Sequence, residues 1–229
     1  MKAYKTNLIL IFLLLGISPW AFSASAEMSS KHLRLVKDLM NNNLAYSQDA
    51  TTTNIIEWEE EIVDSLRQKK DYRNMFLMKQ MAVYAYSLQA KISEALKKAD
   101  AMMDEARLMK YNIGISLSYQ ALGDIYLNAG MRPEAVEEYE KAMKTLQATP
   151  HAEKIQERIF IQLVPTLIKL KRMDEAKAYL EHMSEICESK CLSPFLLYAY
   201  HAYYYLRNND LSKAREYIDE AIKINSRTP

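Results

Sequence analysis

The sequence predicts an all-α solenoid of stacked helical hairpins, and three observations support this fold class. Hydrophobic residues make up 49% of the 229 residues, while only 4 are Gly and 6 are Pro, a balance that favours helices over turn-rich β structure. Within residues 116–146, apolar residues recur three or four positions apart, the spacing of one helix face. Similar segments recur along the chain, and their anchoring alanines, Ala95, Ala135, Ala176 and Ala214, are 40, 41 and 38 residues apart.

Residues 116–146 predict two helices that pack against each other. The contact face of the first helix consists of Tyr119, Leu122, Gly123 and Tyr126. After a break, Pro133 stands near the start of the second helix, where its missing N–H is tolerated. The second helix presents Ala135 and Tyr139 on one face. Because Gly123 and Ala135 are small, we expect the two helices to approach closely.

This hairpin resembles the tetratricopeptide repeat (TPR), whose pattern is W-x2-L-G-x2-Y followed by A-x3-F. The chain has Tyr119-x2-Leu122-Gly123-x2-Tyr126, followed by Ala135-x3-Tyr139. The resemblance implies a right-handed α-α superhelical solenoid whose first helices line a concave groove. One such hairpin cannot bury its own apolar face, so further hairpins are expected beside it.

Four repeats are predicted between residues 72 and 229, at about 76–115, 116–156, 157–194 and 195–229. The other packing positions are Tyr86 with Ala95, Ala176, and Tyr205 with Ala214. The family's usual period is about 34 residues. The longer spacing here predicts longer second helices or longer loops. Pro165 is expected to kink its helix.

Residues 1–26 are predicted to be a cleavable export signal. Lys2 and Lys5 precede a short apolar run, and Ala24-Ser25-Ala26 fits the small-residue rule for cleavage. An uncleaved anchor and a buried helix are the alternatives. Cleavage after Ala26 implies a periplasmic or secreted protein without stable membrane insertion.

Residues 27–71 are predicted to form a divergent helical pair that caps the solenoid. Residues 29–44 carry one apolar helix face, and residues 48–53 are predicted to be a polar loop. Asn54 is then expected to cap a second helix, with Glu57 completing a capping-box pair.

Chemistry-bearing motifs are scarce. With so few glycines, the sequence excludes dinucleotide-binding, Walker A and nucleophile-elbow loops. Cys187 and Cys191 can form a disulfide, remain free thiols or, with His182, contribute to a metal site, and the metal site is the least favoured of the three. No catalytic residue, metal ligand or cofactor is predicted. Without Lys2 and Lys5, the chain has 28 basic and 29 acidic residues, so nothing favours nucleic acid as a partner.

A partner-binding face is predicted from the repeat geometry implied by the resemblance. Residues on the groove side of the first helices are Gln80, Tyr84, Gln120, Asp124, Asn128, Lys169, Tyr203 and Arg207. Amides, two tyrosines and a basic end suit an extended peptide or a partner helix, with the tyrosines as rigid anchors. The basic clamp by which some family members hold a carboxylate is not reproduced.

The sequence therefore favours an exported, non-catalytic adaptor or scaffold that binds a protein or peptide in its groove. The alternative is the extracytoplasmic sensor module of a two-component or transcription-regulatory system, because exported arrays of this type resemble the sensor portions of membrane-bound histidine kinases or regulators. The last repeat lacks a capping helix, which makes it a candidate surface for homo-oligomer formation.

Overall fold

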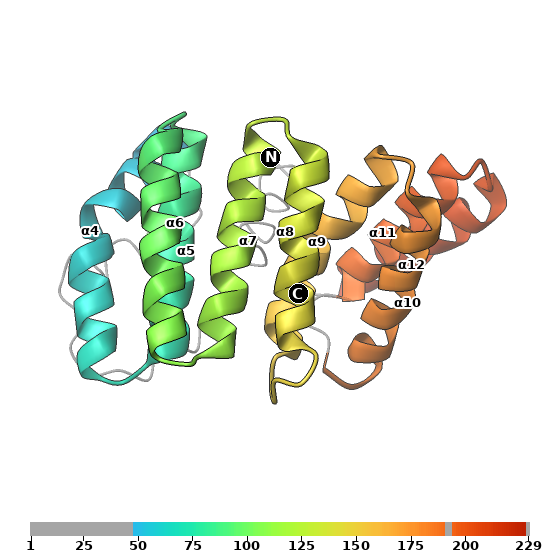
Figure 1. The fold of residues 1–229 in the computed structure, drawn as a ribbon. Coiled ribbons are helices and arrows are strands. Elements are labelled where there is room, and N and C mark those ends of the chain that lie inside the picture. Colours follow the sequence, from blue (N-terminus) through green and yellow to red (C-terminus); the bar gives the residue numbers. More distant parts are fainter. Residues whose placement is uncertain (1–47, 191–193, 228–229) are drawn as a thin grey trace.

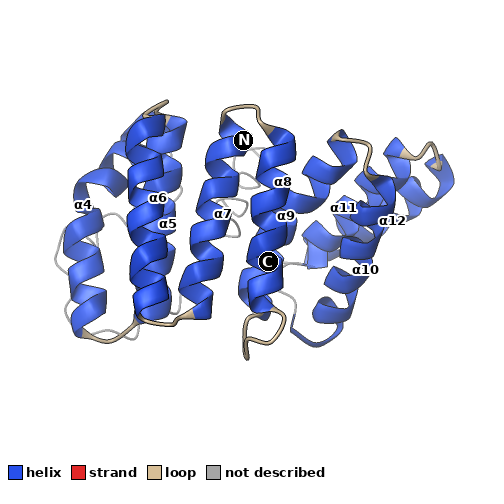
Figure 2. Ribbon diagram, viewed as in Figure 1, coloured by secondary structure: helices blue, strands red, loops and turns tan. Residues whose placement is uncertain are grey.

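The computed structural model describes residues 48–190 and 194–227, and every element in these ranges is an α-helix. The helices are α4 (Gln48–Gln68), α5 (Tyr72–Leu88), α6 (Ile92–Leu108), α7 (Asn112–Asn128), α8 (Arg132–Leu146), α9 (Glu153–Lys169), α10 (Met173–Lys190), α11 (Pro194–Arg207) and α12 (Leu211–Arg227). Figures 1 and 2 show them as a row of antiparallel hairpins from α4 at one end to α11 and α12 at the other. The predicted all-α repeat solenoid is confirmed.

The hairpins form two layers with different contacts. The first helices α5, α7, α9 and α11 each pack against the next, while each second helix packs against the first helix that follows it. The second helices α6, α8 and α10 make no comparable contact with one another. Since the first helices lie closer together, the stack curves towards their side. We call α5, α7, α9 and α11 the first-helix layer.

The period of about 40 residues is built from two units of about 20, each a helix and the connection that follows it. The turns place one residue in the left-handed region: Lys70, Ala90, Lys110, Gly130, His151, Lys171 and Asn209. In most of them the next N–H bonds back to the final helical turn, as from Lys91 N to the Tyr86 carbonyl at 3.0 Å. Only one of these residues is glycine, so the sequence carries little signal for the turns.

Three local expectations differ from the structure. Residues 48–53 are helical rather than a loop, and α4 runs through Asn54, so Asn54 caps no helix. The predicted repeats also begin at 76, 116 and 157, whereas α5, α7 and α9 start at Tyr72, Asn112 and Glu153, about four residues earlier. At α5 the start follows a polar cap, because Asp71 Oδ1 accepts a hydrogen bond from the N–H of Asn74. Apolar periodicity finds the packed face of a helix and does not fix the residue at which the helix begins.

Helix α9 continues through Pro165. Because proline has no N–H, it cannot donate to the carbonyl of Ile161, four residues earlier. The hydroxyl of Tyr200 on α11 donates to that carbonyl at 3.1 Å instead. The lost helical bond is thereby replaced by a contact between neighbouring hairpins.

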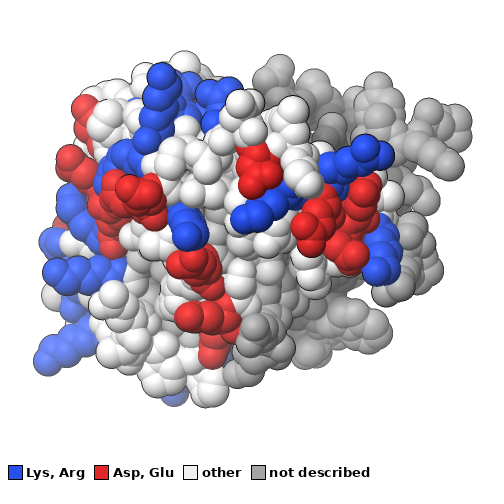
Figure 3. Space-filling model, turned by 90° about the vertical axis from the view of Figure 1, so that its right-hand side faces the viewer, with Lys and Arg blue, Asp and Glu red and all other residues white. Residues whose placement is uncertain are grey.

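Charged side chains of both signs mix over the surface, as Figure 3 shows for the end formed by the last hairpins. Several ion pairs join neighbouring helices. Arg67 and Lys79 both pair with Glu105, and Arg172 Nη2 lies 3.1 Å from Glu140 Oε1. Being partly exposed, these pairs contribute little stability each.

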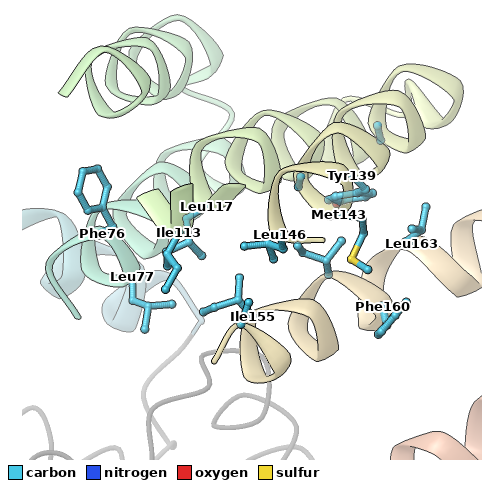
Figure 4. Close-up of a cluster of buried hydrophobic side chains, with 14 of the residues drawn as sticks. Phe76, Leu77, Ile113, Leu117, Tyr139, Met143, Leu146, Ile155, Phe160 and Leu163 are labelled. Carbon is cyan, nitrogen blue, oxygen red and sulfur yellow. The ribbon is translucent and has the colours of Figure 1, made fainter. Parts of the chain in front are cut away.

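The core runs along the stack as one large cluster, with a second, smaller cluster among α5, α6 and α7. Figure 4 shows buried side chains from α5, α7, α8 and α9 that meet between the layers, among them Phe76, Leu117, Leu146 and Phe160. The four anchoring alanines, Ala95, Ala135, Ala176 and Ala214, are all buried. Each hairpin therefore completes the core of its neighbours.

Candidate functional site

The first-helix layer holds the residues that the sequence predicts for partner binding, but three of them are not on an open surface. Gln80, Gln120 and Asp124 are only 4%, 3% and 4% exposed. They lie where α5, α7 and α9 pack together. The expectation that these three are accessible groove residues is therefore wrong. For Asp124, the physical reason is the neighbouring Gly123. This glycine lets α8 come close, and α8 then covers Asp124.

Asp124 is the centre of a buried hydrogen-bonded group, the Asp124 cluster, formed with Gln80, Tyr139 and Arg158. The Gln80 amide donates to Asp124 Oδ2 at 2.7 Å, and the Tyr139 hydroxyl donates to Asp124 Oδ1 at 2.8 Å. Arg158 Nη2 donates to Gln80 Oε1 at 2.9 Å. The chain Arg158–Gln80–Asp124 thus links three successive first helices.

Burial sets the electrostatics of the Asp124 cluster. Desolvation raises the pKa of Asp124 to about 6, against hydrogen bonds from Tyr139 and Gln80 and the charge of Arg158, which favour the carboxylate. Desolvation likewise lowers the pKa of Arg158 to about 10, and Asp124 opposes that shift. The two groups carry opposite charges at neutral pH and partly compensate each other.

Some buried polar atoms of the Asp124 cluster and of the nearby Gln120 lack a hydrogen-bond partner. Gln120 Oε1 and the Nε and Nη1 of Arg158 are buried without a hydrogen-bond partner. Each such group costs free energy in the folded state. A side chain or water that entered this layer with suitable acceptors would satisfy Arg158.

Two other predicted residues lie at the edge of the cluster. Tyr84 is half-buried, and its pKa is raised by burial and by the charge of Asp124. Asn128 is exposed, and its amide donates to Ser87 Oγ at 2.7 Å, which ties the end of α7 to α5.

The remaining predicted residues lie towards the C-terminal hairpins. Lys169 and Arg207 are exposed at the ends of α9 and α11, and Tyr203 is half-buried. They do not join the Asp124 cluster. The layer therefore has a buried polar centre and, further along, accessible aromatic and basic side chains.

The predicted packing positions separate into two groups. Ala95, Ala135, Ala176, Ala214 and Tyr139 are buried. Tyr86, Tyr119, Leu122, Tyr126 and Tyr205 are half-buried, and all five pack against the core. Tyr205 stacks on Tyr217 of α12 with ring centroids 5.4 Å apart.

Other predicted features are only partly within the described residues. Cys191 and the side chain of Cys187 lie outside them, as do residues 1–47. Between 48–190 and 194–227, no group of three or more His, Cys, Asp or Glu side chains is placed to hold a metal. The same search of these helices finds none long and apolar enough to span a membrane.

A hollow of about 230 Å³ lies on the other side of the stack, between α8, α9 and α10. Its lining is mixed: Glu140, Met143, Lys144, Gln147, Gln156, Tyr179 and His182. His182 meets the Phe160 ring edge-on, with centroids 5.6 Å apart. None of the predicted binding residues contributes to it.

Sequence reasoning missed the role of Arg158. For Tyr139 it predicted the packing but not the hydrogen bond to Asp124. Arg158 stands among the apolar residues Ile155, Ile159 and Phe160, and such a position signals a buried charge in need of a partner. A buried tyrosine likewise needs an acceptor for its hydroxyl. The acceptor, Asp124, lies 15 residues upstream and is brought close only by the hairpin.

Comparison with known families supports the repeat assignment. The family model of the tetratricopeptide repeat matches residues 117–145 and 197–228, which fall on α7–α8 and α11–α12. A search of curated proteins gave no significant match. The two matched hairpins are therefore of the tetratricopeptide type, and the intervening α9–α10 continues the same stack.

Proposed function

We propose that the chain is an exported, non-catalytic interaction module that binds a peptide or a partner helix along the first-helix layer. One observation carries the proposal: tetratricopeptide hairpins stack so that α5, α7, α9 and α11 form one continuous layer. Tetratricopeptide repeats generally mediate contacts between proteins. An extended partner lying across such a layer would meet side chains from every hairpin.

The accessible side chains of the layer favour a polar partner with some acidic character. Tyr84 and Tyr203 are half-buried, so they offer rigid aromatic surface at little entropic cost. Lys169 and Arg207 are exposed and have no ion pair with another described residue. Such cations suit carboxylates on the partner.

Export rests on the N-terminal pattern of Lys2, Lys5, the apolar run and Ala24-Ser25-Ala26. The test is the mass and N-terminal sequence of the chain recovered from the exported fraction. Processing after Ala26 would leave Glu27 first. A chain that stays in the cytoplasm with residues 1–26 attached would refute export, and retention in the membrane would favour the sensor alternative.

The binding proposal is tested with a partner isolated by cross-linking in the exported fraction. Replacing Tyr84 and Tyr203 by Ala is expected to raise the dissociation constant at least about tenfold, as for loss of aromatic anchors. Lys97→Ala and Lys177→Ala, on the exposed sides of α6 and α10, are matched controls that should leave affinity unchanged. Equal affinities for both sets of variants would refute the assignment to the first-helix layer.

A further inference from the structure

The last helix, α12, carries large apolar side chains at positions that the repeat normally covers. Aligning Ala135 with Ala214 places Ile218 at the position of Tyr139 and Ile222 at that of Met143. Tyr139 and Met143 are 0% and 6% exposed, while Ile218 and Ile222 are 45% and 60% exposed. In the described chain, α12 packs chiefly on α11, and no helix follows it as α9 follows α8.

These exposed residues form a regular seam. Leu211, Arg215, Ile218 and Ile222 are spaced by 4, 3 and 4 residues, the pattern by which one helix packs along another. All four are exposed. The seam runs most of the length of α12, and its centre combines apolar side chains with one cation.

One cation in the seam, Arg215, and one anion beside it, Asp219, have no ion pair with another described residue. Both side chains are exposed, and they lie one turn apart. The neighbouring Glu220 does pair with Lys223, at 3.2 Å. Figure 3 looks onto this end of the solenoid and shows both signs of charge beside uncharged surface.

We propose that α12 pairs antiparallel with α12 of a second copy of this chain, about a two-fold axis near Tyr217. This arrangement sets Leu211 of one copy against Ile222 of the other, twice. It also brings Arg215 within reach of Asp219 of the second copy, twice. The same surface thus supplies both halves of every contact, which is the requirement for a two-fold interface. The proposal is independent of partner binding on the first-helix layer.

The self-complementarity of the seam favours a second copy of this chain as its partner. Antiparallel reversal exchanges the two apolar ends of the seam and places the unpaired cation Arg215 opposite the unpaired anion Asp219, which lies beside the seam. Opposite charges that meet across an interface fix its register and orientation. Because the interface consists of one helix from each copy, it is small, and we expect a concentration-dependent equilibrium between monomer and dimer.

The first test is sedimentation equilibrium of the processed full chain from low micromolar to near-millimolar concentration. The wild type is expected to shift from monomer to dimer over this range. Ile218→Asp combined with Ile222→Asp should remain monomeric, with unchanged helix content by circular dichroism because both residues are exposed. Leu108→Asp, at an exposed apolar position on α6, is the matched control and should dimerise like the wild type.

The second test addresses the antiparallel register. Arg215→Asp alone and Asp219→Arg alone should each weaken the dimer at least tenfold, because like charges then meet. The double variant Arg215→Asp with Asp219→Arg should restore dimerisation. A wild type that stays monomeric throughout, a dimer that survives both Ile substitutions, or a double variant that does not recover would each overturn the proposal. A monomer would leave this face to a different protein or to another segment of the polypeptide.

Discussion

The ring of Tyr139 lies directly on the backbone of Gly123, where the two helices of the best-preserved hairpin cross. A Cβ at position 123 would fall 2.5 Å from Tyr139 Cε1 and 2.7 Å from Cδ1. The same tyrosine reaches past the glycine and donates to Asp124. One contact therefore sets both the spacing of α7 and α8 and the geometry of the buried Asp124 cluster.

Gly123→Ala should destabilise the protein by about 2 kcal/mol or more, because the added methyl must displace a fully buried ring. The free energy of unfolding in urea measures the effect. Tyr139→Leu in the same chain supplies a matched test, since the smaller side chain makes room for the methyl. We expect Gly123→Ala to cost much less in the Tyr139→Leu background; equal costs would contradict the contact.

Tyr139→Phe should cost roughly 1–3 kcal/mol, because it leaves Asp124 Oδ1 buried without its donor while keeping the packing. The Tyr139 hydrogen bond also lowers the pKa of Asp124. Its removal should therefore raise that pKa above the wild-type value of about 6. Unfolding free energies measured at several pH values test both effects, and Tyr126→Phe, which alters a half-buried tyrosine of the same hairpin, is the control.

Asp124 should make the stability of the protein fall as pH rises from 4 to 7 relative to Asp124→Asn. Its pKa is about 6 in the folded chain and 3.8 as an ordinary carboxyl. A raised folded-state pKa gives stability that is fully present below the unfolded value and lost as pH passes the folded value. The difference of about two pKa units corresponds to roughly 3 kcal/mol.

The comparison with Asp124→Asn is necessary because other carboxyls act in the opposite direction. Ion pairing lowers the pKa of Glu105 and of Glu175, so the stability that these two carboxylates contribute to the protein is lost in acid. They are present in both proteins, and their effects cancel in the difference. A difference that does not change between pH 4 and 7 would show that Asp124 titrates normally.

Ala90→Gly should stabilise the protein by about 0.5–1 kcal/mol. Ala90 has φ of 57°, a left-handed conformation that a Cβ disfavours and glycine tolerates. Ala101→Gly, at an exposed position inside α6, is the matched control and should destabilise by about 1 kcal/mol. Thermal unfolding of both variants measures the two signs, and a loss of stability in both would contradict the turn conformation.

Tyr200→Phe should destabilise the chain by about 1 kcal/mol, because the Ile161 carbonyl loses the donor that replaces its helical bond. Pro165→Ala restores an N–H that can donate to this carbonyl. We therefore expect Tyr200→Phe to cost less in the Pro165→Ala background, and a double-mutant cycle measures the coupling. Additive effects would mean that the two residues act separately.

Much of the architecture could be predicted because it repeats. Alanines that the structure buries recur about every 40 residues. Together with aromatic residues at helical spacing, they mark the packed faces of the helices. Turns and helix starts were harder to predict. Ala90, Lys110 and Lys171 give no turn signal, and they adopt the left-handed conformation because the helices on either side must reverse.

The candidate site was predicted less well than the fold. Repeat spacing placed Gln80, Gln120 and Asp124 on the first helices, which is where they lie, and wrongly predicted that they are accessible. Arg158 was not predicted at all. Helical periodicity gives the direction of a side chain around its own helix, but not the distance to the next helix.

By itself, the sequence determined the class of fold, the register of the hairpins and the small-residue contacts that allow close packing, because these follow from spacing along one helix or between two adjacent helices. Only the tertiary structure decided that Asp124 is buried under Tyr139, that Arg158 joins it through Gln80, and how far Ile218 and Ile222 are exposed. Each of these depends on how closely the helices approach one another in space, which residue spacing along the chain does not give, and burial, pKa and exposure follow from that distance.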